Sequence, residues 1–141
     1  MFSIGQLAAQ TGAKVPTIRY YEGIGLLQAA GRNAGNQRRY DRAALERLGF
    51  IRHARALGFS LEDIRALIEM SAHPEQPCAA LNQIARDQLA ATRARIAQLQ
   101  RLEAELARIA AECDGGTVGA CSVLAALGDH SQCAGPHLAE Q

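Results

Sequence analysis

Long apolar runs are absent from this chain of 141 residues. A membrane-spanning helix needs about 18 or more consecutive apolar residues, so none is expected. The N-terminal stretch MFSIGQLAAQTGAK has no basic segment followed by a long apolar one, and it therefore does not read as a secretory signal. Hydrophobic residues make up 48% of the chain and charged residues 21%, which argues against disorder. We expect a cytoplasmic protein that does not contact membranes.

The residue patterns on which most enzymes depend are also missing. The chain has no Cys-x-x-Cys pair and no βαβ pattern, and it offers no Ser/His/Asp or paired-carboxylate arrangement. A thiol redox enzyme that uses the four cysteines is the alternative from a different functional class. The cysteine spacing does not favour it, and we predict that the protein is not an enzyme.

The small net charge of +1 conceals an uneven distribution. Residues 1–65 carry ten basic and five acidic side chains, a net charge of +5. Residues 66–141 carry five arginines and nine acidic side chains, a net charge of −4. Such asymmetry indicates nucleic-acid binding by the basic half, although solvated arginines alone can also produce it.

Short helices separated by turn residues are predicted for the basic half. Ser3 can cap a first helix that ends at Gly12, and a second helix begins near Val15. Two short helices joined by a glycine-containing turn match a helix-turn-helix, although any small helical hairpin looks similar. Residues 26–40 have short apolar flanks around a Gly/Asn-rich turn, which predicts a small hairpin or loop.

Two further helices are predicted after residue 40. Asp41 is expected to cap a helix that runs to about Leu57, and Ser60 begins another with the spacing of a capping box. Residues 70–77 contain two prolines and must interrupt the helical structure.

Residues 78–112 contain neither proline nor glycine and predict a helical rod. At 1.5 Å per residue the rod is roughly 50 Å long. Its apolar residues recur about every 3.5 positions, which is the coiled-coil period. The stripe begins at Thr92 and continues through Ile96, Leu99, Leu102, Leu106 and Ile109. Because the small head cannot cover such a rod, we predict a homodimer. A glycine-rich loop, a short helix and a loose tail follow the rod.

Four cysteines in a cytosolic protein are more often metal ligands, redox-active groups or buried thiols than disulfides. Cys78 and Cys113 lie at opposite ends of the rod, so they cannot share a metal within one chain. In an antiparallel pair of rods, however, Cys78 of one chain lies beside Cys113 of the other, and the following loop can add Cys121. Soft thiolates select Zn, Cd, Pb, Hg or Cu(I) over Mg or Ca. The alternative is that each cysteine is a small buried hydrophobic residue.

Three motifs carry a family resemblance. TIRYYEGIGLL at residues 17–27, NQRRY at residues 36–40 and LGFSLEDI at residues 57–64 precede the long helix. In order and spacing over residues 2–112 they resemble the MerR family of transcription regulators, and the C-terminal loop resembles its heavy-metal-sensing branch. The resemblance implies an all-α fold with a small β wing, namely a winged helix-turn-helix head plus a long antiparallel dimerisation helix.

Domain limits follow from that resemblance. Residues 1–70 would form the DNA-binding domain, residues 71–112 the linker and coiled-coil dimerisation helix, and residues 113–141 the metal-binding loop, short helix and tail. Cys133, His130 and His137 in the tail are candidates for an accessory site or for a loose end. Family members that sense organic molecules usually add a larger ligand domain, for which little chain follows the rod.

The resemblance also implies double-stranded promoter DNA and RNA polymerase as partners. Residues 15–22 would enter the major groove, and the wing would contact phosphates. The implied DNA-binding residues are Lys14, Thr17, Arg19, Tyr20, Tyr21, Arg38, Arg39 and Tyr40. For Tyr21, core packing is an equal alternative. In the family's mechanism the dimer sits on an overlong promoter spacer, and effector binding bends and undertwists the DNA.

The implied effector is a divalent soft metal ion held by Cys78, Cys113 and Cys121. In the family's copper(I) branch a residue other than cysteine stands where Cys78 is, so the resemblance favours a divalent ion. The zinc-type loop usually carries a cysteine pair and a histidine, which this loop lacks. Three thiolates suit Cd²⁺ or Pb²⁺, with Zn²⁺ and Hg²⁺ as alternatives.

Overall fold

The computed structural model describes residues 1–112 and 115–128 of the chain. Cys113, Cys133, His130 and His137 therefore lie outside the described residues. The chain divides into two compact units, Met1–Ile84 and Ala85–Gln141, which we describe separately. No helix in the described ranges is both long enough and apolar enough to cross a membrane.

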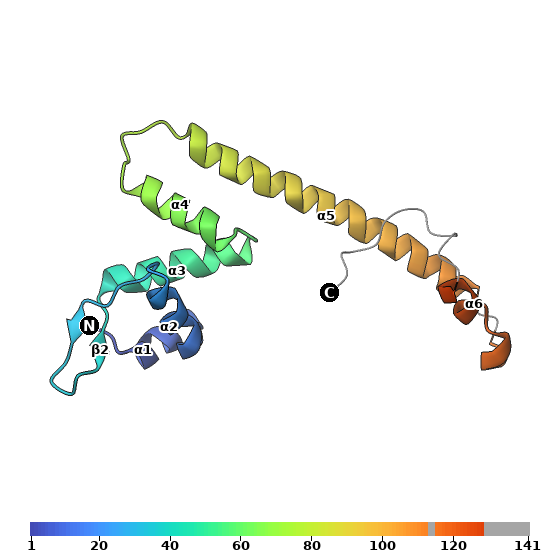
Figure 1. Cartoon of the computed structure of the whole chain (residues 1–141), viewed down its shortest axis with the longest axis horizontal. Coiled ribbons are helices and arrows are strands. Elements are labelled where there is room, and N and C mark those ends of the chain that lie inside the picture. Colours follow the sequence, from blue (N-terminus) through green and yellow to red (C-terminus); the bar gives the residue numbers. More distant parts are fainter. Residues whose placement is uncertain (113–114, 129–141) are drawn as a thin grey trace. The chain divides into compact units, whose positions relative to one another are not determined.

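The predicted helix-turn-helix begins the first unit (Figure 1). Helix α1 spans Ile4–Thr11, and its N-terminus is closed by a capping box in which Ser3 and Gln6 exchange hydrogen bonds. Gly12 ends it with a positive φ of 77°, a conformation that glycine adopts without strain. Helix α2 spans Val15–Gly23 with proline in its first turn. Both predicted helices are confirmed.

A two-stranded hairpin follows, as the turn residues predict. Strand β1, Gly31–Arg32, pairs antiparallel with β2, Arg38–Arg39. The turn is held by Asn33, whose Oδ1 accepts hydrogen bonds from two backbone N–H groups of the turn. Phe2 and Tyr40 add an isolated bridge of two backbone hydrogen bonds, each 2.7 Å long. The wing is thus anchored to the start of the chain.

Helices α3 (Arg42–Ala56) and α4 (Leu61–Ser71) complete the head. Asp41 caps α3 by accepting from the backbone N–H of Ala44 at 2.9 Å. Ser60 caps α4 in the same way, with Asp63 as the donor at 3.0 Å. Both caps are at the residues that the sequence predicts. The core that they frame takes side chains from all four helices and from the wing. Its most buried members are Tyr40, Leu7, Ile18, Leu27, Leu48, Ile51 and Ile64.

Tyr40 brings a polar group into this core. Its side chain has no exposed surface, and its hydroxyl donates to Glu22 Oε2 at 2.7 Å. Burial, together with the hydrogen bond and the negative charge of Glu22, raises the pKa of Tyr40 to about 12. The phenol therefore remains a neutral donor at any physiological pH.

Helix α5 spans Ala79–Ala111 without interruption, which confirms the predicted rod. The Cys78 carbonyl accepts the first hydrogen bond of the helix, from Asn82 N–H at 2.9 Å. Within the second unit the apolar stripe is largely uncovered: Ile96, Leu99 and Leu106 are 49%, 43% and 55% exposed. Ile109 alone of the six predicted stripe residues is buried. A 3₁₀ turn, Val118–Ala120, and helix α6, Ser122–Gly128, follow.

Replacement of Tyr40 by phenylalanine tests how much the buried hydroxyl contributes to the stability of the head. The folded pKa of about 12 exceeds the ordinary tyrosine value of 10.0. The hydroxyl's contribution to stability is therefore complete below pH 10 and is lost as the pH rises towards 12. We expect Tyr40→Phe to lower the free energy of unfolding by about 2 kcal/mol at neutral pH, as for a hydrogen bond to a charged group.

Urea unfolding measures the free energy of unfolding, and tyrosinate absorbance, followed from neutral pH to pH 12, measures the titration of the hydroxyl. The exposed Tyr20→Phe is the matched control, and it should retain the absorbance step near pH 12. Persistence of that step in Tyr40→Phe would contradict the assignment.

Candidate nucleic-acid interface

A basic groove lies between α2 and the wing. Its volume is about 450 Å³, and α2 contributes Arg19 to its lining. The hairpin contributes Arg32 and Arg38, one from each strand. All three arginines are exposed. A concave surface that presents three guanidinium groups has the charge and the donors to bind phosphate oxygens.

The surface of α2 divides into a core face and an outer face. Ile18 and Tyr21 are buried, whereas Arg19 and Tyr20 are exposed and Tyr20 has 54% of its surface accessible. Lys14, which immediately precedes the helix, is exposed as well. Thr17 is half-buried. The outer face is therefore polar and available, as a helix that reads base edges requires.

Hydrogen bonds and an ion pair hold the arginines of the wing in place. Arg38 Nε pairs with Glu22 Oε1 at 3.0 Å, while the Arg38 side chain remains 45% exposed. Arg32 Nη1 donates to the Asn36 carbonyl at 2.9 Å, and Arg39 Nη2 donates to the Met1 carbonyl at 3.3 Å. Each side chain thus loses part of its conformational freedom before any ligand arrives, which lowers the entropic cost of binding.

Two of the predicted DNA-binding residues have buried side chains. Tyr40 is fully buried, and its hydroxyl donates to Glu22 from beneath the groove, so the side chain supports the head. Tyr21 is also buried, which selects the core-packing alternative for that residue. Both rings therefore offer little surface to a ligand, and their described contacts are with the head itself.

The sequence prediction omitted two residues of this site. Arg32 lines the groove, and Glu22 connects Arg38 to Tyr40. The register of the hairpin places Arg32 opposite Arg38, and the positive charges close to the turn were the available signal for Arg32. No local pattern marks Glu22, because its contact with Tyr40 spans 18 positions of sequence.

The described cysteines, Cys78 and Cys121, are candidate metal ligands and lie outside the basic groove. Cys78 is exposed at the start of α5 and lines a cavity of about 720 Å³ together with Met70 and His73. Cys121 follows the 3₁₀ turn and is half-buried. Within the described residues of a single chain, no three His, Cys, Asp or Glu side chains gather closely enough to hold a metal. The donors suit a soft metal ion, but a complete ligand set would need more than these residues of one chain.

Family models match most of the chain. One described as "MerR HTH family regulatory protein" matches residues 2–71, and one described as "MerR, DNA binding" matches residues 45–109. The two matches overlap within α3 and α4 and together include the groove, Cys78 and most of α5.

Individual relatives agree with that match. The chain is 41% identical over 130 residues to the HTH-type transcriptional regulator ZntR of Escherichia coli, covering 90% of this chain and 92% of the relative. The crystal structure of PbrR691 from Ralstonia metallidurans in complex with lead(II) is 37% identical, with a TM-score of 0.77, over 90% of this chain and 99% of that chain.

A third comparison includes nucleic acid. The crystal structure of HiNmlR, a MerR family regulator bound to promoter DNA, is 25% identical with a TM-score of 0.58. The alignment covers 89% of this chain and 94% of that chain. The predicted family, the helical fold with a two-stranded wing and the non-enzymatic class are confirmed by these matches. The chain belongs to the MerR family of transcription regulators.

Proposed function

We propose that this protein is a metal-responsive regulator that binds promoter DNA as a homodimer and activates metal-resistance genes when a soft divalent metal ion binds. The observation that carries the proposal is the position of an exposed thiol, Cys78, at the first residue before the long and largely uncovered helix α5. The lead(II) complex of PbrR691, at 37% identity, supports the metal assignment.

The groove and the outer face of α2 would make different kinds of contact with DNA. Arg19, Arg32 and Arg38 would contact phosphates and so position the head, whereas the exposed residues of α2 would read base edges. Tyr20, which is exposed, would contact the sugar-phosphate backbone. The structure of HiNmlR bound to promoter DNA supports promoter binding by this fold.

The stripe on α5 supports the homodimer. Three large apolar side chains of the coiled-coil pattern are about half exposed in the single chain. A second copy of the same helix, packed antiparallel, would cover them with an equivalent stripe. In that arrangement the start of one α5 meets the end of the other.

Antiparallel pairing would also supply the missing metal ligands. Cys78 of one protomer would join Cys113 and Cys121 of the other, which gives three thiolates per site and two sites per dimer. Cys113 lies outside the described residues, and its part in the site rests on its place in the sequence, two residues after α5. The metal, when bound, supplies Lewis acidity that holds the thiols as thiolates and links the two protomers.

Activation would follow from the coupling of this site to the heads. Distortion of promoter DNA requires a few kcal/mol, which a ligand that prefers one state of the dimer can provide. RNA polymerase would then engage the realigned promoter elements. Among soft ions, three thiolates favour Cd²⁺ or Pb²⁺, with Zn²⁺ as a further candidate. An Hg²⁺-responsive regulator of the same family is the second candidate function, since linear thiolate coordination would need only two of the three cysteines.

Substitution of the groove arginine Arg32 tests the DNA contact. Arg32→Ala should weaken binding to promoter and unrelated DNA alike and reduce the slope of log K against log [salt] by about 1, because one phosphate contact is lost. Fluorescence anisotropy at several salt concentrations measures the slope. Arg93→Ala, an exposed arginine on α5, should leave it unchanged. An unaltered slope for Arg32→Ala would exclude this contact.

A charge placed on the stripe tests the homodimer. Leu99→Asp should convert the dimer to a monomer, because an unpaired carboxylate would be buried in the interface. Analytical ultracentrifugation measures the mass. The neighbouring exposed residue gives the matched control, Gln100→Asp, which should remain dimeric. A dimeric Leu99→Asp protein would show that the stripe is not the interface.

Removal of the Cys78 thiol tests the shared metal site. Transcription in vitro from the protein's own promoter, titrated with Zn²⁺, Cd²⁺, Pb²⁺, Hg²⁺ and Cu(I), should rise with divalent soft ions and lose that response in Cys78→Ser. Cys133→Ser should respond as the wild type does. A full response of Cys78→Ser would refute the three-thiolate site, and a response to Cu(I) alone would refute the divalent assignment.

A further inference from the structure

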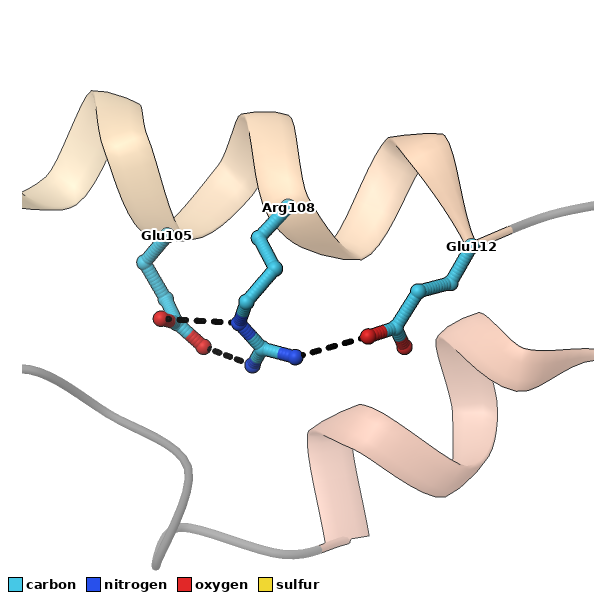
Figure 2. Close-up of polar contacts among 3 residues, drawn as sticks. All are labelled: Glu105, Arg108 and Glu112. Carbon is cyan, nitrogen blue, oxygen red and sulfur yellow. Dashed lines mark hydrogen bonds and ion pairs between the residues drawn. The ribbon is translucent and has the colours of Figure 1, made fainter.

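Arginine side chains make both local and long-range contacts in the described part of the chain. On α5, Arg108 pairs with the buried Glu105, three positions earlier, and with Glu112, four positions later (Figure 2). Pairs at these spacings lie within one helix and stabilise that helix. On α4, by contrast, Arg65 Nη2 donates to the backbone carbonyl of Ile24, 41 positions earlier in the sequence, at 2.5 Å. This contact connects two separate elements of the head.

Ile24 lies where α2 ends. The Leu26 N–H donates to the Tyr21 carbonyl at 2.9 Å, and Gly25 between them in the bend has a positive φ of 83°. This is the Schellman arrangement, which satisfies a carbonyl of the last helical turn. The Ile24 carbonyl comes after that turn, and the guanidinium of Arg65 satisfies it. A cation at this end of a helix also interacts favourably with the helix dipole.

The C-terminal end of α2 is thus held from two sides. On the side of the wing, Glu22 accepts a hydrogen bond from Tyr40 and pairs with Arg38. On the side of α4, the guanidinium of Arg65 holds Ile24, and its Nη1 lies 3.8 Å from where a Cβ on the adjacent glycine would be. A second anchor on a different element restricts tilting of the helix about the first.

Tilting matters because these anchors and the residues proposed to meet base pairs lie at opposite ends of α2. Lys14 precedes the helix, and Thr17 and Arg19 lie in its first half. A helix of nine residues is about 13 Å long, so a tilt of about 10° about one end moves the other end by about 2 Å. Contacts with base edges need positions held to about 0.5 Å, whereas a phosphate attracts a cation over longer distances. The tilt of α2 should therefore affect sequence discrimination more than the overall affinity for DNA.

We propose that Arg65 is a positioning residue for sequence discrimination: by capping α2 from α4, it fixes the angle at which α2 presents its outer face to base pairs, and it does not bind DNA itself. This inference rests on the proposed function, because it concerns base reading by α2. It adds a residue outside the basic groove and outside α2 to the determinants of the promoter sequence that the protein selects.

The test compares the affinity of the full-length protein for a duplex of its own promoter with that for an unrelated duplex of equal length. Fluorescence anisotropy at several salt concentrations measures both. Arg65→Gln should lower the ratio of the two association constants roughly tenfold, which is the effect of about one lost base contact. The slope of log K against log [salt] should not change, because no phosphate contact is lost. Arg95→Gln, an exposed arginine on α5, removes the same charge and should match the wild type.

A direct contact of Arg65 with a phosphate predicts a different pattern. Both affinities would fall together and the salt slope would decrease by about 1, and this result overturns the proposal. A ratio that is unchanged in Arg65→Gln overturns it as well. Arg65→Lys keeps a cationic donor for the Ile24 carbonyl and should recover most of the wild-type ratio; no recovery would contradict the cap.

Amide hydrogen exchange of the DNA-free protein gives an independent measurement. The N–H groups of Gly25 and Leu26 should exchange faster in Arg65→Gln than in the wild type, because the bend that they close has lost its cap. The N–H of the core residue Ile51 should be unaffected. Unchanged exchange at the bend would overturn the proposal. Because Arg65 is exposed, the variant should fold, as circular dichroism can check; Arg65→Met, which keeps most of the aliphatic stem but has no donor, takes its place if it does not.

The wild-type measurement separates this inference from the function on which it rests. A wild-type protein that binds its own promoter and unrelated DNA with equal affinity overturns base reading by α2, and this inference with it. A wild-type protein that discriminates between them, together with an Arg65→Gln protein that discriminates equally well, overturns this inference alone.

Discussion

The hydrogen bond between Tyr40 and Glu22 is the interaction on which the geometry of the head depends. It joins the end of the wing to α2 across 18 positions of sequence, and it is made by a side chain with no exposed surface. The second oxygen of the same carboxylate holds Arg38 at the edge of the basic groove. One buried phenol therefore sets the position of a surface guanidinium relative to the helix beside it. Because the phenol stays neutral up to a pKa of about 12, this link does not change with physiological pH.

A second constraint comes from the length of α5. A helix of 33 residues presents more apolar surface than one small unit can cover, and the exposed stripe of Ile96, Leu99 and Leu106 remains after folding. A second copy of the helix would complete the burial of this stripe. In the proposed homodimer the same contact that buries the stripe would bring Cys78 of one protomer to the loop of the other. Assembly and effector binding would then share one interface.

Local chemistry made much of the fold predictable from the sequence. The caps at Ser3, Asp41 and Ser60 and the glycine-terminated α1 depend on residues within four positions of one another, and all were predicted. Burial of Tyr40 was not, because it results from a backbone bridge to Phe2 and a distant carboxylate. An RRY motif next to a turn carries no sign of which of its side chains faces the core. Glu105 was missed for a related reason: its spacing from Arg108 is visible in the sequence, whereas its burial is not.

The proposed metal site and the proposed DNA site constrain each other thermodynamically. If metal binding favours the state of the dimer that distorts DNA, then DNA held in the distorted form must raise the metal affinity by the same factor. Such coupling requires a site whose ligand geometry changes when the protomers move, and a site completed by cysteines of both chains has this property. A site formed within one loop could bind the same ion with equal affinity in both states, and it would then transmit nothing to the promoter. The placement of Cys78 at the far end of α5 from Cys113, and not simply the number of thiols, is therefore what would make this chain a sensor.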